Sequence, residues 1–247
     1  MNNREFLNSI KQMYEKYLDT HRRSSEKLKP FHGMIAEDLQ NRLGENYKVF
    51  SLGYEAGKEK TIEGKYMDKK VDISIFKKNG RSLDEIGGIA LKSIMTNYAQ
   101  NSNNYFENML GETANLRSNS KLYFQILVLP EIMPYFGNKT INGVEKKDVV
   151  KKNETLNVEK LSKYVSMSND NIDNSLFLPN KTLLYLINTH DTQMDISNYP
   201  TRSEWVSYMK QNLNIKLSSQ NLNFGEGIIY NNYESFIQAV VQKILED

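Results

Sequence analysis

The sequence predicts an α/β fold in which a central sheet is flanked by helices. Apolar residues alternate along two segments, 71–76 and 89–94, as they do in strands that bury one face. A helical pattern follows over 103–117, and a strongly apolar run over 123–129, closed by Pro130, predicts a buried strand. The order strand, strand, helix, strand is typical of an α/β core.

Two further helices are predicted before these strands, over 3–18 and 30–43. The second helix follows Pro30 and carries Ile35 and later leucines on one face. A strand is predicted near 49–52, between this helix and the alternating segments. The core is therefore preceded by additional helices.

The second half of the chain has a weaker pattern. Residues 131–157 are predicted to be loops of a long insertion, because Pro134, Gly137 and Gly143 interrupt the segment. The remaining expected elements are a helix over 158–168, a strand over 182–187, a helix bracketed by Arg202 and Lys210 with Trp205 packed inward, and a last helix over 233–245. We find no internal repeat or linker, so a single domain over 1–247 is predicted.

Composition limits the possible functions. The 247 residues are 39% hydrophobic, which is enough for a sizeable core. The absence of cysteine excludes thiol catalysis, cysteine zinc sites and disulfides, and suits a reducing cytosol. No segment approaches the roughly 20 apolar residues of a membrane span, so a cytoplasmic protein is expected. The net charge of +2 means that any surface for nucleic acid must be local.

Asp72 and Lys92 are the leading candidates for chemistry. They lie 20 residues apart on the two alternating segments, and each points to the face opposite the alternating apolar residues. Neighbouring strands would hold a carboxylate beside an ammonium, which suits a metal ion that acts on a phosphate. The alternatives are a structural salt bridge or two solvated positions on an edge hairpin.

Other chemistries have little support in the sequence. His21, His32 and His190 are far apart and lack the spacing of metal ligands, so a zinc hydrolase would need distant partners. The segment 53–57 contains two glycines but lacks the Gly-Lys-Ser/Thr ending of a phosphate loop.

With Asp72, Lys92 and the asparagine-rich start of the helix that follows, residues 65–130 resemble the PD-(D/E)XK nuclease superfamily, and within it the type II restriction endonucleases. The pattern is an Asp on one strand, then an acidic residue, any residue and Lys on the next. Ala90 departs from the pattern, because alanine cannot bind a metal. The resemblance implies that a carboxylate of the following helix replaces it.

Glu107, 15 residues after Lys92, is the predicted replacement, followed by Glu112 and then Glu85. The resemblance also implies that Glu37, on the second amino-terminal helix, adds a metal ligand. The fold implied is a mixed sheet of the restriction-endonuclease-like core, with the catalytic core over about 30–130 and insertion and DNA-recognition elements in the remainder.

The function implied is a Mg²⁺-dependent, site-specific double-stranded DNA endonuclease of a prokaryotic cytosol. In this interpretation Asp72 and Glu107 bind one or two Mg²⁺ ions and Lys92 positions the attacking water. A homodimer would match a palindromic site. The residues expected to contact DNA are Arg22, Arg23, Lys27, Asn97, Asn101, Asn104 and Arg202. The alternatives are a repair or junction nuclease of the same superfamily and a DNA-binding module that has lost catalysis.

Overall fold

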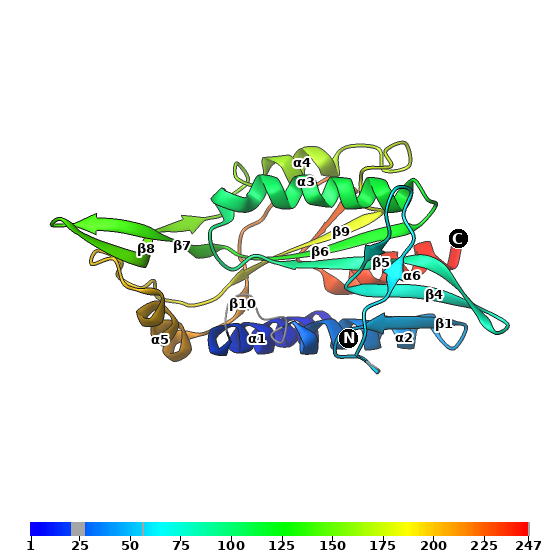
Figure 1. Ribbon diagram of the computed structural model, residues 1–247, viewed down its shortest axis with the longest axis horizontal. Helices are drawn as coiled ribbons and strands as arrows, with labels where there is room; N and C mark the ends of the chain where they lie inside the picture. The colour runs from blue at the N-terminus through cyan, green and yellow to red at the C-terminus, as the bar shows by residue number, and fades with distance from the viewer. Residues whose placement is uncertain (21–27, 56, 247) are drawn as a thin grey trace.

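A mixed sheet forms the centre of the protein, whose computed structural model describes residues 1–20, 28–55 and 57–246 (Figure 1). In spatial order its strands are β1 (Tyr47–Ser51), β4 (Ile73–Asn79), β5 (Ser82–Ser93), β6 (Leu122–Pro130), β9 (Lys181–Asn188) and β10 (Lys216–Leu217), with β11 (Ile228–Tyr230) also paired to β9. β1, β4 and β5 pair antiparallel, whereas β5, β6 and β9 are parallel. The predicted α/β fold with a mixed central sheet is confirmed.

Helices cover both faces of this sheet (Figure 1). One face carries α1 (Asn3–Asp19), α2 (Lys29–Leu43) and α6 (Tyr233–Glu246). The other face carries α3 (Tyr98–Arg117) and α4 (Ser162–Ser168). A further helix, α5 (Arg202–Asn212), follows β9 and packs Trp205 inward, as predicted. None of the helices in the described chain combines the length and apolar character that crossing a membrane requires.

Burial on both faces explains why β6 and β9 are apolar at nearly every position. In β6, Phe124 and Ile126 pack beneath α1, α2 and α6, whereas Leu127 packs beneath α3 and α4. In β9, Tyr185 and Leu184 divide between the two faces in the same way. The sheet therefore separates two hydrophobic layers. Strand β9, from the second half of the chain, belongs to the same sheet.

The prediction of loops over 131–157 is wrong. This region forms the hairpin β7 (Ile132–Ile141) and β8 (Val144–Thr155), which projects from one end of the sheet (Figure 1). Asn142 and Gly143 both have positive φ, at 51° and 80°, as a two-residue hairpin turn requires. Gly137 lies at an irregularity of the pairing, where an interrupted pattern is compatible with a strand. The short strands β2 (Thr61–Ile62) and β3 (Lys69–Lys70) pair separately.

The predicted helices and strands of the core are confirmed with small changes of boundary. The largest changes are in β5, which begins at Ser82 rather than near residue 89, and in α3, which begins at Tyr98 rather than near residue 103. Asn97, immediately before it, has φ 54° and exchanges two hydrogen bonds with the backbone of Phe136, at 2.8 and 3.0 Å. This contact with β7 allows the helix to begin earlier than its apolar pattern does.

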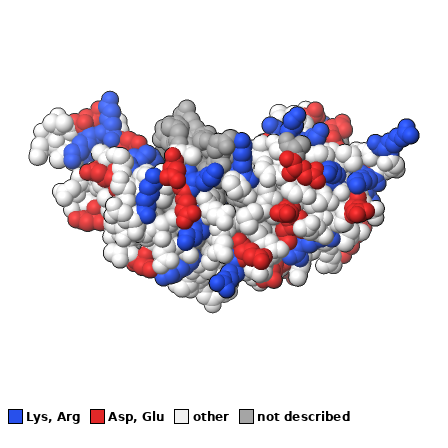
Figure 2. Space-filling view, turned by 90° about the horizontal axis from the view of Figure 1, so that it is seen from below, with Lys and Arg blue, Asp and Glu red and all other residues white. Residues whose placement is uncertain are grey.

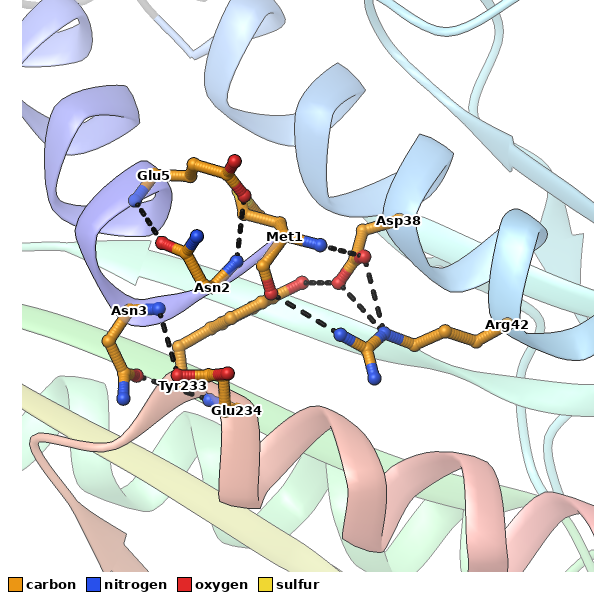
Figure 3. A network of polar contacts seen from close by, with 8 residues as sticks. All are labelled: Met1, Asn2, Asn3, Glu5, Asp38, Arg42, Tyr233 and Glu234. Atoms are coloured by element: carbon orange, nitrogen blue, oxygen red, sulfur yellow. Dashed lines mark hydrogen bonds and ion pairs between the residues drawn. The ribbon is translucent and has the colours of Figure 1, made fainter.

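A buried ionic network joins the first residues to α2 and α6 (Figure 3). The Asp38 carboxylate accepts hydrogen bonds from the amino group of Met1, from Nε of Arg42 at 3.2 Å and from the Tyr233 hydroxyl at 2.8 Å. Asp38 is 8% exposed and Tyr233 is fully buried. Burial and the adjacent Asp38 carboxylate both raise the pKa of Tyr233, so its hydroxyl remains a donor.

Replacing Asp38 with Ala should destabilise the protein by about 3 kcal/mol, because three donors would lose a charged acceptor in a buried place. Denaturant unfolding of the parent and the variant measures the difference. Glu37→Ala is the matched control, since Glu37 is the exposed neighbour on the same helix and its loss should change stability by less than about 0.5 kcal/mol. Equal effects in the two variants would contradict a structural role for the network.

Candidate functional site

A polar pocket of about 220 Å³ brings Asp72 and Lys92 together. Asp72 directly precedes β4, and Lys92 lies near the end of the antiparallel strand β5, so both reach the same end of the strand pair. The other residues of the pocket lie on β3, β5, α3 and β6 or directly after β3: Lys69, Lys70, Val71, Ala90, Glu112 and Tyr123. The strand pattern thus predicted two of the charged residues of this pocket.

Asp72 is held by contacts to two other strands. Its Oδ2 accepts a hydrogen bond from the backbone N–H of Leu91 at 2.7 Å, and its backbone carbonyl accepts one from the Ser51 hydroxyl at 2.7 Å. Burial raises the pKa of the Asp72 carboxyl, against the lowering effects of the Leu91 hydrogen bond and of the nearby Lys92 ammonium. The site therefore holds a carboxylate under an electrostatic cost that a bound cation would relieve.

Lys92 is half-buried in the pocket. No ion pair within 4.0 Å joins its ammonium to any acidic group of the described residues. A structural salt bridge between Asp72 and Lys92 is therefore not found. The ammonium can donate to water or to a phosphate oxygen.

Glu112, on α3, is the carboxylate that faces Asp72 across the pocket. Its two oxygens accept hydrogen bonds from Lys69 Nζ at 2.6 Å and from the Tyr123 hydroxyl at 2.8 Å. Burial alone would raise the pKa of Glu112, but the hydrogen bond from Lys69, the charge of the nearby Lys92 and the hydrogen bond from Tyr123 hold the pKa below its usual value. Glu112 therefore remains ionised at neutral pH.

Glu107, which was predicted to replace the acidic residue missing at Ala90, does not line this pocket. It is exposed on α3, and the charge it influences is that of Lys163 on α4. Side chains five residues apart on an α-helix point in directions about 140° apart, so Glu107 and Glu112 cannot point the same way. Glu85 is also elsewhere, because its carboxylate accepts the backbone N–H of Glu63 at 2.8 Å and lies 3.9 Å from Lys121.

On α2, too, the predicted ligand Glu37 points away from the site, and the residue five positions earlier points toward it. Glu37 is exposed, whereas His32, five residues earlier, is buried and approaches Asp72. Ligand atoms of His32, Glu59 and Asp72 all lie within 4.8 Å of one another. Neither His32 nor Glu59 was predicted from the sequence as a site residue. His32 lies next to the buried stripe that includes Ile35, which is a signal for burial, but Glu59 lies in a segment without any periodic pattern.

His32 is neutral in this setting. Burial is the main cause that lowers the pKa of His32 to about 4; the charge of Glu59 opposes this shift and the charge of Lys92 adds to it. Both ring nitrogens are buried without a hydrogen-bond partner. A neutral imidazole with free lone-pair capacity can act as a metal ligand.

A larger hollow of about 920 Å³ lies beyond the end of β5. Its walls come from the first turns of α3, from the β7–β8 hairpin and from α5, and three residues predicted to contact DNA line it: Asn97, Asn101 and Arg202. Ligands of α/β proteins commonly bind beyond the carboxyl ends of parallel strands, which is where this hollow lies.

Several of the residues predicted to contact DNA already have partners. The Asn97 amide binds the backbone of β7, and Arg202 forms two hydrogen bonds with Asp148 at 2.7 and 3.1 Å while lying 3.7 Å from the Phe136 ring centre. Asn104 is exposed and does not line the hollow. Arg22, Arg23 and Lys27 lie outside the described residues.

Surface charge does not by itself indicate where a nucleic acid would bind. On the face that carries α1 and α2, basic and acidic side chains are interspersed (Figure 2). This distribution agrees with the net charge of +2. On this face, charge alone therefore does not mark a surface for phosphates.

The chain matches no protein-family model, no curated protein and no solved structure. The resemblance to restriction endonucleases therefore stays a prediction. Function has to be argued from the geometry and chemistry of the site itself.

The donors around Asp72 fit a hard divalent cation. Asp72 and Glu112 supply carboxylate oxygens, the ligands that Mg²⁺ prefers. Lys69 now neutralises Glu112, and its side chain is 34% exposed, so it can move to solvent when a cation takes its place. Ala90 leaves room in the pocket but offers no ligand.

Asp72→Asn should raise the melting temperature at pH 7. Because the folded-state pKa of Asp72 is raised, ionising it costs stability as the pH rises above its usual value of 3.8, and asparagine avoids that cost while still accepting from Leu91. The difference should disappear near pH 3, where the parent residue is protonated. Thermal unfolding at both pH values checks this, with Asp68→Asn at an exposed position as the control. A variant less stable than the parent at pH 7 would contradict the raised pKa.

Proposed function

We propose that the protein is a Mg²⁺-dependent, site-specific endonuclease of double-stranded DNA, built on a restriction-endonuclease-like core. The observation that carries the proposal is the convergence of Asp72, Lys92 and Glu112 on one pocket from three different elements. Two carboxylates can hold a cation, and an uncommitted ammonium beside them can act on a phosphodiester. Glu112 would supply the carboxylate that Ala90 lacks.

In this proposal Asp72 and Glu112 hold Mg²⁺. When bound, the ion supplies positive charge that stabilises the developing negative charge on the phosphate and the leaving 3′ oxygen. Lys92 donates to the attacking water and orients it toward phosphorus. Tyr123 keeps Glu112 in place through its hydroxyl, at 2.8 Å.

Charge balance also favours a phosphate substrate. With both carboxyls ionised, Asp72 and Glu112 carry two negative charges, and Lys69 and Lys92 carry two positive charges. A divalent cation that displaces Lys69 to solvent would leave the pocket with an excess of one positive charge, which equals the single negative charge of a phosphodiester. An anionic diester would restore neutrality, whereas a neutral substrate would not.

The larger hollow beside Lys92 would receive the DNA next to the cut. Gln100 and Asn101 line it from α3, and amide side chains of this kind can read base edges. Lys147, on the hairpin, can contact a phosphate. A palindromic site would be matched by a twofold homodimer, which we propose as the DNA-bound form.

Incubation with Mg²⁺ and a long duplex of mixed sequence tests the function. Discrete fragments support a site-specific endonuclease. Preference for branched or damaged DNA would indicate a repair or junction nuclease instead. Binding without any cleavage would indicate a DNA-binding module that has lost catalysis.

Asp72→Asn, Lys92→Ala and Glu112→Gln should each lower the cleavage rate by at least about 100-fold and leave DNA affinity nearly unchanged, because they remove cation or water handling but not base contacts. Single-turnover cleavage and a binding titration in Ca²⁺ measure the two effects. Glu107→Gln is the matched control on the same helix and should retain the parent rate. A fully active Glu112→Gln variant would remove Glu112 from the site.

A restored carboxylate tests whether Ala90 and Glu112 serve the same cation. Ala90→Glu in a Glu112→Ala background should recover part of the Mg²⁺-dependent rate, since both positions line the pocket that contains Lys92. Recovery should be partial, because a displacement of about 1 Å can cost on the order of 100-fold in rate. The double variant with Ala90→Gln should recover nothing.

Gln100→Ala combined with Asn101→Ala should weaken binding to the cleaved sequence by about 10- to 100-fold, with little effect on random DNA, because the amides would read bases. Lys147→Ala should instead weaken both equally and reduce the slope of log affinity against log salt by up to about 0.9. Asn104→Ala, at an exposed position outside the hollow, is the control. Unchanged binding in the amide variant would place the DNA elsewhere.

A further inference from the structure

We propose that His32, Glu59 and Asp72 form a second cation site, which takes a borderline transition metal such as Zn²⁺ rather than Mg²⁺. The ligand atoms of the three side chains lie within 4.8 Å of one another, close enough to share one ion. Asp72 is common to this site and to the pocket with Lys92. The proposal concerns metal binding and does not depend on nuclease activity.

The buried imidazole of His32 is the observation that points to a ligand. His32 is only 1% exposed, yet neither ring nitrogen has a hydrogen-bond partner in the described structure. A buried polar group without a partner is costly, and native proteins rarely retain one without a reason. A metal ion bound through one nitrogen would supply the missing interaction.

The backbone brings the three ligands together before any ion binds. α2 approaches the turn at Gly53 so closely that a Cβ at Gly33, next to His32, would clash with the Gly53 carbonyl oxygen. The carbonyl of Lys60, next to Glu59, accepts hydrogen bonds from Ser74 Oγ at 2.9 Å and from the Val71 N–H at 3.3 Å. These contacts fix the helix and the segment around Glu59 against the start of β4.

The donor set selects the kind of ion. One imidazole and two carboxylates suit Zn²⁺ and chemically similar ions, whereas Mg²⁺ prefers oxygen ligands alone. Three protein ligands leave a coordination position for water or substrate. Glu59 now pairs with Lys70 at 3.2 Å, but the Lys70 side chain is 64% exposed and can be displaced.

Titration of the chelator-treated protein with Co²⁺ tests the site, because Co²⁺ replaces Zn²⁺ at such sites and absorbs visible light according to its ligands. We expect one tightly bound Co²⁺ per chain, not displaced by a large excess of Mg²⁺. His32→Gln and Glu59→Gln should each weaken Co²⁺ binding by more than about 100-fold, since loss of an outer partner alone costs 10- to 100-fold. Glu112→Gln should bind Co²⁺ like the parent protein.

Two results would overturn the proposal: no Co²⁺ bound by the parent at millimolar concentration, or unchanged binding in Glu59→Gln. Glu59 is partly exposed in an irregular segment, so its variant tests the site even if the His32 variant fails to fold. Circular dichroism confirms that each variant is folded. Glu112→Gln separates the two proposals, because it should lose cleavage while keeping Co²⁺.

Discussion

The hydrogen bond from the backbone of Leu91 to the Asp72 carboxylate joins the start of β4 to the end of β5. The backbone carbonyl of Asp72 binds Ser51, so β1 is fixed at the same point. β5 also pairs with β6, which carries Tyr123, and leads directly into α3, which carries Glu112. The positions of both candidate cation sites therefore depend on this one junction.

Stability and chemistry are opposed at this junction. Asp72 is a carboxylate whose pKa is raised by burial, and His32 is a buried imidazole without a partner. Both are unfavourable in the folded chain, and a cation at the proposed sites would relieve both costs. Lys69 and Lys92 limit the cost by balancing the carboxylates, as Met1 and Arg42 do for Asp38 in the structural network. The difference is that both oxygens of the Asp38 carboxylate already accept hydrogen bonds from groups of the protein.

Much of the fold follows from local patterns in the sequence. The alternation around Asp72 and Lys92 and the apolar runs of β6 and β9 depend on nearest neighbours and on which faces are buried, so these strands were predicted, although β5 begins at Ser82, well before its alternating segment. The β7–β8 hairpin was missed although Asn142 and Gly143 carry a turn signal, because glycine and proline were interpreted as breakers. The two-residue strands β2, β3 and β10 are too short to have a period.

The sequence by itself determined the α/β core and the placement of Asp72 and Lys92 at one end of a strand pair, because strand periodicity fixes which face a side chain takes. Only the tertiary structure decided between Glu107 and Glu112, and between Glu37 and His32. Each choice depends on how a helix is rotated about its axis, and a shift of five residues turns a side chain by about 140°. Glu59 reaches Asp72 through long-range packing of an irregular segment, which no local period encodes.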